Sequence, residues 1–306
     1  MSTPVRTPAA SLRVFLNGII DYAGLFPPAS LDMRRAVTNY SRYLASPEQW
    51  ALGRFVLPVA RLDEFLNAQE NVVNDPWNLS GILSLNIAAD LATVGEFNRK
   101  APGAVMDSVE LRVHSAEEIA LTARLLPAGV AAFFEIAPEQ AAELLPEVRR
   151  VNARAKLRTG GVVEEAFPAL ERIAEFIATC AELSVAVKAT AGLHHPLRCV
   201  RPLTYEANAH EGLMHGFMNL FTAAAIAWSA VHAGNAVPLG ALATCLADGE
   251  RAHWHFDEDA MTWSGNLEPV RIDLGDLRIM RSDLALSFGS CSFEEPLGDL
   301  HELDLL

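Results

Sequence analysis

The chain has 306 residues, of which 51% are hydrophobic and 20% are charged, so it can bury a large core and global disorder is excluded. Its 24 basic and 38 acidic side chains give a formal net charge of −14, which disfavours nucleic acid and anionic membranes as main partners. The length fits either one large α/β barrel or two small domains.

Short β-rich runs alternate with helical runs over the first two thirds of the chain. The sequence predicts a first strand within 14–22 and a helix over 31–44, and the later strands are expected at 54–59, 80–85, 108–113, 131–136, 155–159 and 185–189. The helices between them are expected at 62–73, 88–100, after Ser115 with Glu118 in a capping box, from Pro138, and at 167–183. This alternation indicates parallel strands.

An eighth strand would close the sheet into a barrel, and 216–220 or 284–288 can supply it. We therefore predict an α/β fold, a single (β/α)8 TIM-type barrel over residues 1–306 with an extended C-terminal elaboration. Residues of about 234–280, the least regular part, are the expected elaboration. An open doubly wound sheet is the alternative, which is weakened because no G-x-G-x-x-G follows an early strand.

Several features bear on the surroundings of the protein. Four cysteines without a C-x-x-C pair favour a reducing cytoplasm over a zinc knuckle or a disulfide scaffold. The first ten residues lack the apolar core of a signal peptide. The apolar run at 217–231 is shorter than the ~20 residues of a membrane span, so it predicts a helix buried in the core or in a homo-oligomer interface.

In a (β/α)8 barrel the active site forms at the C-terminal ends of the strands, so polar residues there are the site candidates. The residues expected to be catalytic are Lys156, Lys188, His194, His195, Glu110 and Glu135. The residues expected to bind the ligand are Asp21, Tyr22, Asn86, Arg112, Arg158, Thr159, Gly160, Gly161, Thr190 and Ser290.

Two successive predicted strands each carry a lysine and end in a glycine turn, AKLRTGG at 155–161 and VKATAGL at 187–193. Two buried ammonium groups repel, so one of them is expected to lose its proton more easily. A neutral amine is what Schiff-base chemistry requires, and glycine turns let backbone N–H groups approach an anion. The alternative is a structural network in which the lysines pair with Glu110 and Glu135.

Together with IIDYAGL (19–25), DSVEL (107–111) and FGSCS (288–292), these segments resemble the class I aldolases of the deoxyribose-phosphate aldolase type. The resemblance implies that Lys156 forms the Schiff base, that Lys188 lowers its pKa and that Asp107 assists proton transfer. It further implies that Gly160, Gly161 and Ser290 lie near a phosphate. The chain as a whole also resembles a bacterial family of (β/α)8-barrel proteins without an assigned activity.

Histidine is concentrated in one part of the chain, because seven of the nine lie between His194 and His255. His194 and His195 directly follow a predicted strand, where they can act as general acid–base groups. With nearby carboxylates they can alternatively hold a divalent metal.

These patterns predict an enzyme of the aldolase or lyase type that acts on a small anionic carbonyl compound and needs no cofactor. One alternative is a metal-dependent lyase, isomerase or hydrolase that uses His194 and His195. The other is a catalytically silent barrel that binds a ligand.

Overall fold

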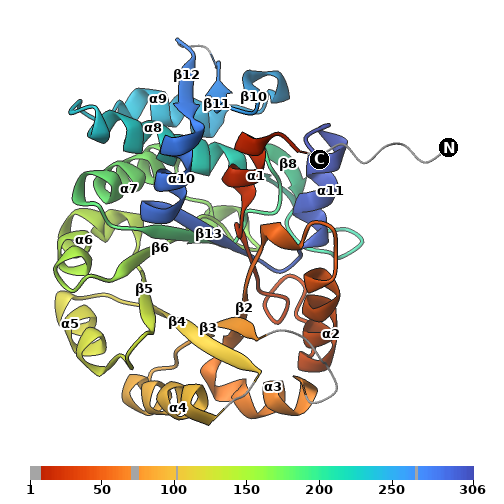
Figure 1. Cartoon of the computed structure of the whole chain (residues 1–306), viewed down its shortest axis with the longest axis vertical. Helices are drawn as coiled ribbons and strands as arrows, with labels where there is room; N and C mark the ends of the chain where they lie inside the picture. The colour runs from red at the N-terminus through yellow and green to blue at the C-terminus, as the bar shows by residue number, and fades with distance from the viewer. Residues whose placement is uncertain (1–7, 70–75, 101–102, 266–267) are drawn as a thin grey trace.

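The computed structural model describes residues 8–69, 76–100, 103–265 and 268–306. Eight parallel strands close into a barrel in the order β1-β13-β7-β6-β5-β4-β3-β2, which confirms the predicted TIM-type fold (Figure 1). The strands are β1 (Ile20–Tyr22), β2 (Leu52–Pro58), β3 (Trp77–Ile82), β4 (Ala104–Arg112), β5 (Ala131–Glu135), β6 (Arg154–Arg158), β7 (Val187–Thr190) and β13 (Ala285–Ser290).

Helices surround the barrel (Figure 1). They are α1 (Ala10–Leu16), α2 (Met33–Leu44), α3 (Leu62–Gln69), α4 (Ile87–Lys100), α5 (Ala116–Leu125), α6 (Ala141–Arg150), α7 (Leu170–Leu183), α8 (Phe217–His232) and α11 (Glu294–Glu302). Short 3-10 helices lie at Gln49–Ala51, Val59–Arg61, Pro138–Gln140, Glu164–Ala166 and Arg251–His253. The cap predicted for α5 is present, because Ser115 Oγ accepts the backbone N–H of Glu118 at 3.3 Å.

Six of the predicted strands, from 54–59 to 185–189, match β2 to β7 within a few residues. The expectation of one strand within 14–22 was wrong in its first part, because residues 10–16 form α1. Ser11, Leu12, Phe15 and Leu16 have helical spacing and are buried together. The last four residues of the predicted helix at 62–73 lie outside the described residues.

The barrel closes through β13, and this decides between the two candidates for the eighth strand. β13 pairs with β1 on one side and with β7 on the other. The competing segment 216–220 instead begins α8, whose residues 217–228 are all buried. Phe217 of α8 stacks on Phe288 of β13, with the ring centroids 4.8 Å apart. No described helix is long and apolar enough to cross a bilayer.

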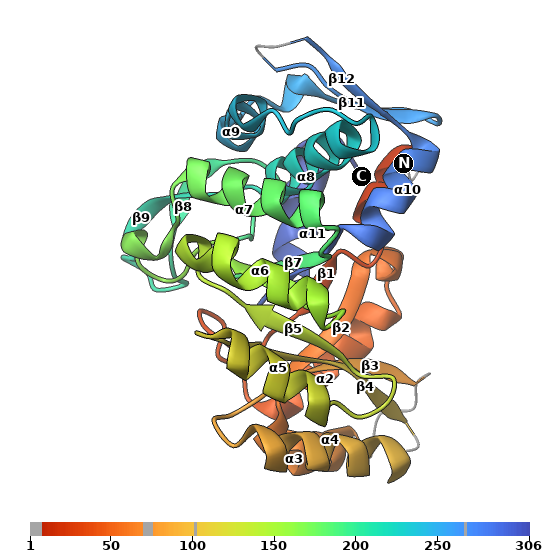
Figure 2. The ribbon, with the colours of Figure 1, turned by 90° about the vertical axis from the view of Figure 1, so that its left-hand side faces the viewer.

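The segment between β7 and β13 carries the elaboration. It contains the hairpin β8 (Cys199–Pro202) and β9 (Glu211–Met214), the helices α9 (Leu239–Ala247) and α10 (Leu274–Asp283), and the sheet β10 (Trp254–Phe256), β11 (Ala260–Trp263) and β12 (Val270–Asp273). This antiparallel sheet lies at one end of the molecule, beyond α8 (Figure 2). Trp254 Nε1 donates to Thr222 Oγ1 of α8 at 3.0 Å, so the sheet is joined to the barrel through α8.

Candidate active site

A cavity of about 350 Å³ opens at the C-terminal ends of the barrel strands. Residues of β2 to β7 and β13, the segments after β1, β6, β7 and β13, and two residues of the segment 199–214 form its wall. Of the residues predicted for the site, those that line the cavity are Glu110, Glu135, Lys156, Arg158, Gly161, Lys188, Thr190 and His194. The cavity thus lies where a barrel of this kind places its chemistry.

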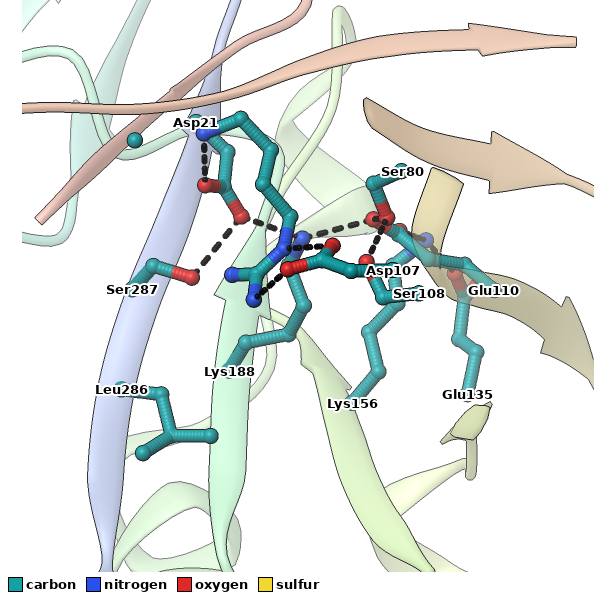
Figure 3. A network of polar contacts seen from close by, with 12 residues as sticks. Asp21, Ser80, Asp107, Ser108, Glu110, Glu135, Lys156, Lys188, Leu286 and Ser287 are labelled. Atoms are coloured by element: carbon teal, nitrogen blue, oxygen red, sulfur yellow. Dashed lines mark hydrogen bonds and ion pairs between the residues drawn. The ribbon is translucent and has the colours of Figure 1, made fainter. Parts of the chain in front are cut away.

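Lys156 and Lys188 lie opposite each other in the register of β6 and β7. Lys188 Nζ is 2.5 Å from Asp21 Oδ2 and 2.6 Å from Glu110 Oε1. Lys156 Nζ is 2.8 Å from Glu110 Oε2 and 2.9 Å from Glu135 Oε2. Glu110 therefore bridges the two lysines, and these five side chains form what we call the ion-pair network (Figure 3).

Neighbouring polar groups hold the carboxylates of the network in place. Ser80 Oγ of β3 donates to Glu110 Oε1 at 2.6 Å. On the other side, Ser287 Oγ of β13 and the backbone N–H of Arg54 each donate to Asp21 at 2.8 Å (Figure 3). These donors satisfy carboxylate oxygens that would otherwise be buried without partners.

The electrostatics of the network favour its charged forms. Burial raises the pKa of Glu110, but the charges of Lys156 and Lys188 outweigh burial and hold that pKa well below its usual value. Burial lowers the pKa of Lys156, but Glu110 and Glu135 outweigh it and raise the pKa above its usual value. The expectation that repulsion between the lysines lowers the pKa of Lys156 was therefore wrong, because a carboxylate lies between them.

Asp107 takes no part in this network, contrary to the expectation from the aldolase resemblance. Its carboxylate instead binds the guanidinium of Arg54 through two contacts of 2.6 and 2.8 Å. The register of β4 against β3 shifts between Met106 and Ser108, so simple alternation does not place Asp107, which lies nearer than Glu110 to the N-terminal end of the strand. Glu110 is the β4 carboxylate that contacts the lysines.

The two histidines after β7 have different surroundings. His194 lines the cavity, and its Nδ1 is 2.8 Å from Glu295 Oε2 of α11. His195 Nδ1 is 2.6 Å from Asp299 Oδ2, and His195 is not part of the cavity wall in the described residues. A carboxylate on Nδ1 fixes the orientation of an imidazole and leaves Nε2 for proton transfer.

The glycine turns have a packing role. An ideal Cβ at Gly160 would lie 2.5 Å from the ring of Phe167, and one at Gly192 would lie 2.7 Å from the same ring. Thr159 Oγ1 donates to the carbonyl of Ala191 at 2.7 Å and ties the two turns together. The ring of Phe167 therefore packs against both turns, and Gly161 and Gly192 of these turns also line the cavity.

Seven of the ten predicted ligand-binding residues are not part of the cavity wall. Asp21 belongs to the ion-pair network, and Thr159 and Gly160 belong to the turn after β6. Tyr22 is buried among aromatic rings, with Tyr43 at a centroid distance of 5.3 Å. Asn86 is exposed after β3, and Arg112 is exposed at the last residue of β4. Ser290 Oγ accepts the backbone N–H of Ser292 at 3.3 Å, within its own turn.

Sequence reasoning missed several supporting residues, namely Ser80, Ser287, Tyr205, Glu295 and Asp299. Glu295 lies three residues after the FGSCS turn, and that position shortly after a strand end was the available signal for it. Among the described residues, no group of three or more His, Cys, Asp or Glu side chains has an arrangement that could hold a metal ion.

No family model matches the chain, and no curated protein matches it. Among solved structures, the fold is similar to that of a deoxyribose phosphate aldolase from Aeropyrum pernix, which is described as a unique tetramer. That match has 13% sequence identity and a TM-score of 0.40, and it covers 61% of this chain and 86% of the other. The assignment of the barrel rests on the strand pairing of this chain itself.

Proposed function

We propose that this protein is a lyase of the class I aldolase type that forms a Schiff base between Lys156 and a small anionic carbonyl compound. The observation that carries the proposal is the pair of buried lysines on the wall of one cavity, in contact with three carboxylates. The chain contains only three lysines, and two of them lie here. Burying ammonium groups costs free energy, so a purely structural site would be built more cheaply from apolar residues.

The surroundings of the two lysines favour Lys156 as the reacting amine. Lys156 is 7% exposed, whereas Lys188 is 1% exposed and lies between the buried carboxylates of Asp21 and Glu110. Glu135, the second partner of Lys156, is only partly buried and lines the cavity. It is therefore the carboxylate that can take a proton from Lys156 and exchange it with solvent.

The proposed reaction begins when the Lys156 ammonium gives a proton to Glu135. The neutral amine attacks the carbonyl carbon, and the former carbonyl oxygen is protonated and leaves as water, which gives an iminium ion. The iminium then accepts the electron pair of the bond between its α and β carbons when that bond breaks, which leaves an enamine on Lys156. Protonation of the enamine at the α carbon and hydrolysis of the resulting iminium by water release the second product and restore the amine. Throughout, Lys188 keeps its contact with Glu110 and so preserves the position of that carboxylate.

His194 is the proposed group for the second proton transfer. Cleavage releases an aldehyde, and the hydroxyl group that becomes its carbonyl must lose a proton. His194 lines the same cavity as Lys156 and is oriented by Glu295 through Nδ1, so its Nε2 can accept that proton.

A second candidate function is a barrel that binds its ligand without chemistry. The raised pKa of Lys156 favours it, because a lysine held as ammonium is not a nucleophile. The two functions differ in one outcome, since only the lyase forms a covalent adduct.

The test is intact-mass spectrometry after borohydride treatment with a panel of small aldehydes, keto acids and sugar phosphates. We expect a stable adduct that maps to Lys156. Lys100 is exposed on α4 and serves as an internal control for nonspecific reaction. An adduct on Lys188 would reverse the two roles, and the absence of any specific adduct would leave the silent ligand-binding barrel.

A further inference from the structure

The cavity wall has a second polar layer above the lysines. In the register of β6 and β7, Lys156 lies opposite Lys188 and Arg158 lies opposite Thr190. Residues two apart on a strand point the same way and lie about 6.6 Å apart, so Arg158 and Thr190 form the layer nearer to the mouth of the barrel. Both line the cavity.

Arg158 lies farther from its carboxylate partner than the two lysines lie from theirs. The contacts of Lys156 and Lys188 with carboxylates measure 2.5 to 2.9 Å, whereas Arg158 Nη1 lies 3.9 Å from Glu135 Oε1. The side chain of Arg158 is 52% exposed. Its planar fork of donors therefore remains available for a ligand, and this geometry suits a carboxylate.

Phosphate is a poor fit for this layer. In the forms that these groups ordinarily take near neutral pH, the ion-pair network carries one negative charge in excess, which Arg158 just offsets. A phosphate monoester adds about −1.5 to −2, whereas a carboxylate adds −1.

The rest of the cavity wall is largely apolar. Side chains that contribute to it include Phe26, Pro28, Val162, Leu203 and Met214. Such a wall favours an apolar substituent on the ligand over further hydroxyl or phosphate groups, which would be buried without partners.

From these observations we infer that Arg158 and Thr190 form a carboxylate subsite above Lys156. The ligand class is then a 2-oxo monocarboxylic acid with a short apolar tail, the fragment that stays on Lys156 when the aldehyde leaves. Its carbonyl carbon meets Lys156 while its carboxylate meets Arg158. This inference rests on the proposed function for the covalent step, but the carboxylate subsite itself can be tested without that step.

The first experiment compares 2-oxobutanoate with 2-oxobutanamide, a neutral compound of similar shape, in borohydride trapping at Lys156. We expect half-saturation at a concentration at least about tenfold lower for the acid, because a charge-assisted contact to Arg158 is lost in the amide. Arg158→Gln removes that preference, Arg158→Lys retains part of it, and Arg112→Gln, outside the cavity, leaves it intact. Equal trapping of the acid and the amide, or stronger trapping of glycolaldehyde phosphate, would refute the carboxylate subsite. Either result would still support the Schiff base at Lys156.

The second experiment measures calorimetric binding of 2-hydroxybutanoate, which cannot form an imine. We expect binding that weakens about tenfold or more in Arg158→Gln and not in Arg112→Gln. Such binding without any trapped adduct would retain the subsite and refute the Schiff-base lyase. An equal affinity for 2-hydroxybutanoate in the wild type and in Arg158→Gln would refute the subsite, whatever result the borohydride trapping gives.

Discussion

At the scale of single residues, the state of Lys156 depends on its two carboxylate partners. Glu110 and Glu135 raise the pKa of Lys156 against the opposing effect of burial. Removing one carboxylate charge while burial persists must lower that pKa. We expect Glu135→Gln to lower the pKa of Lys156 relative to the wild type, because a close opposite charge is lost. Carbamylation by cyanate, followed by peptide mass spectrometry over a pH series, measures this shift.

The reactivity of Lys100 in the same samples is the control, because that lysine is exposed on α4 and far from the substitution in sequence. Its pH profile should be the same in the wild type and the variant. An unchanged profile for Lys156 in Glu135→Gln would mean that Glu135 does not hold the lysine in its charged form, and the proposed proton transfer between them would fail.

The two histidine–carboxylate pairs provide a matched comparison. His194 lines the cavity and is paired with Glu295, whereas His195 is paired with Asp299 outside the described cavity wall. We expect Glu295→Gln to reduce the rate of carbon–carbon cleavage about 100-fold, the usual contribution of an oriented acid–base group. Trapping at Lys156 should persist, because it does not need His194. Steady-state cleavage rates and borohydride trapping, measured on the same samples, separate the two steps.

The control for this comparison is Asp299→Asn, which removes the equivalent carboxylate from His195. Its cleavage rate should stay near that of the wild type. A larger loss in Asp299→Asn than in Glu295→Gln would reassign the proton transfer to His195.

At the scale of elements, the turns after β6 and β7 both pack against the aromatic ring of Phe167. Gly192 has a φ of +71°, and its ideal Cβ would lie 2.7 Å from Phe167. Gly234 has nearly the same φ, +70°, with no atom within 4 Å of the ideal Cβ. We expect Gly234→Ala to cost about 1 kcal/mol of unfolding free energy from backbone strain, and Gly192→Ala to cost about 1–3 kcal/mol more from overpacking. Urea unfolding of both variants measures the difference.

Adding Phe167→Ala to Gly192→Ala tests the cause of that difference. Because the alanine at 167 leaves room for the new methyl group, the two changes together should destabilise less than the sum of their separate effects. Strict additivity would show that contact with the ring is not the reason for glycine at this position.

Most strands of the barrel could be predicted because the sequence pattern that indicates each strand lies within the strand itself. β2 to β7 are short runs of β-forming residues bounded by turns, and Lys156 and Lys188 stood out as charges within such runs. The short β1 was harder, since Ile20–Tyr22 is preceded by α1, whose apolar residues continue into the strand. The sheet β10 to β12 was missed because its three strands of three or four residues lie among glycine-rich segments.

The candidate site could be predicted only in part, because its contacts join distant segments. Asp21 and Lys188 are 167 positions apart, and His194 and Glu295 are 101 apart. Strand alternation also fails at a β-bulge, and the register of β4 against β3 shifts between Met106 and Ser108, so Glu110 and Asp107 could not be ranked before that register was known.

At the scale of the whole molecule, the ion-pair network crosses the barrel. Its members come from β1, β4, β5, β6 and β7, and Ser80 and Ser287 extend it to β3 and β13. The network therefore links seven of the eight strands, including β1 and β13, where the two ends of the sheet meet. Loss of its charge balance should affect the stability of the entire fold.

Glu110 sets how that stability depends on acid. The pKa of Glu110 is lowered in the folded protein, so its contribution is complete above its unfolded pKa of about 4.3 and is lost as pH falls towards the folded value. Lys156 behaves oppositely, because its pKa is raised. Its contribution is present below about pH 10.4 and is lost as pH rises through the folded value.

We expect Glu110→Gln to be about 3–5 kcal/mol less stable than the wild type at pH 7, because it leaves two buried ammonium groups with one carboxylate fewer. The gap between the two proteins should narrow as pH falls from 5 to 3, since only the wild type loses the Glu110 contribution there. Urea unfolding over this pH series measures the gap, and Glu96→Gln on the exposed face of α4 is the control, with little change at any pH. A gap that stays constant from pH 7 to pH 3 would mean that the charge of Glu110 does not hold the network together, and that its hydrogen bonds alone do so.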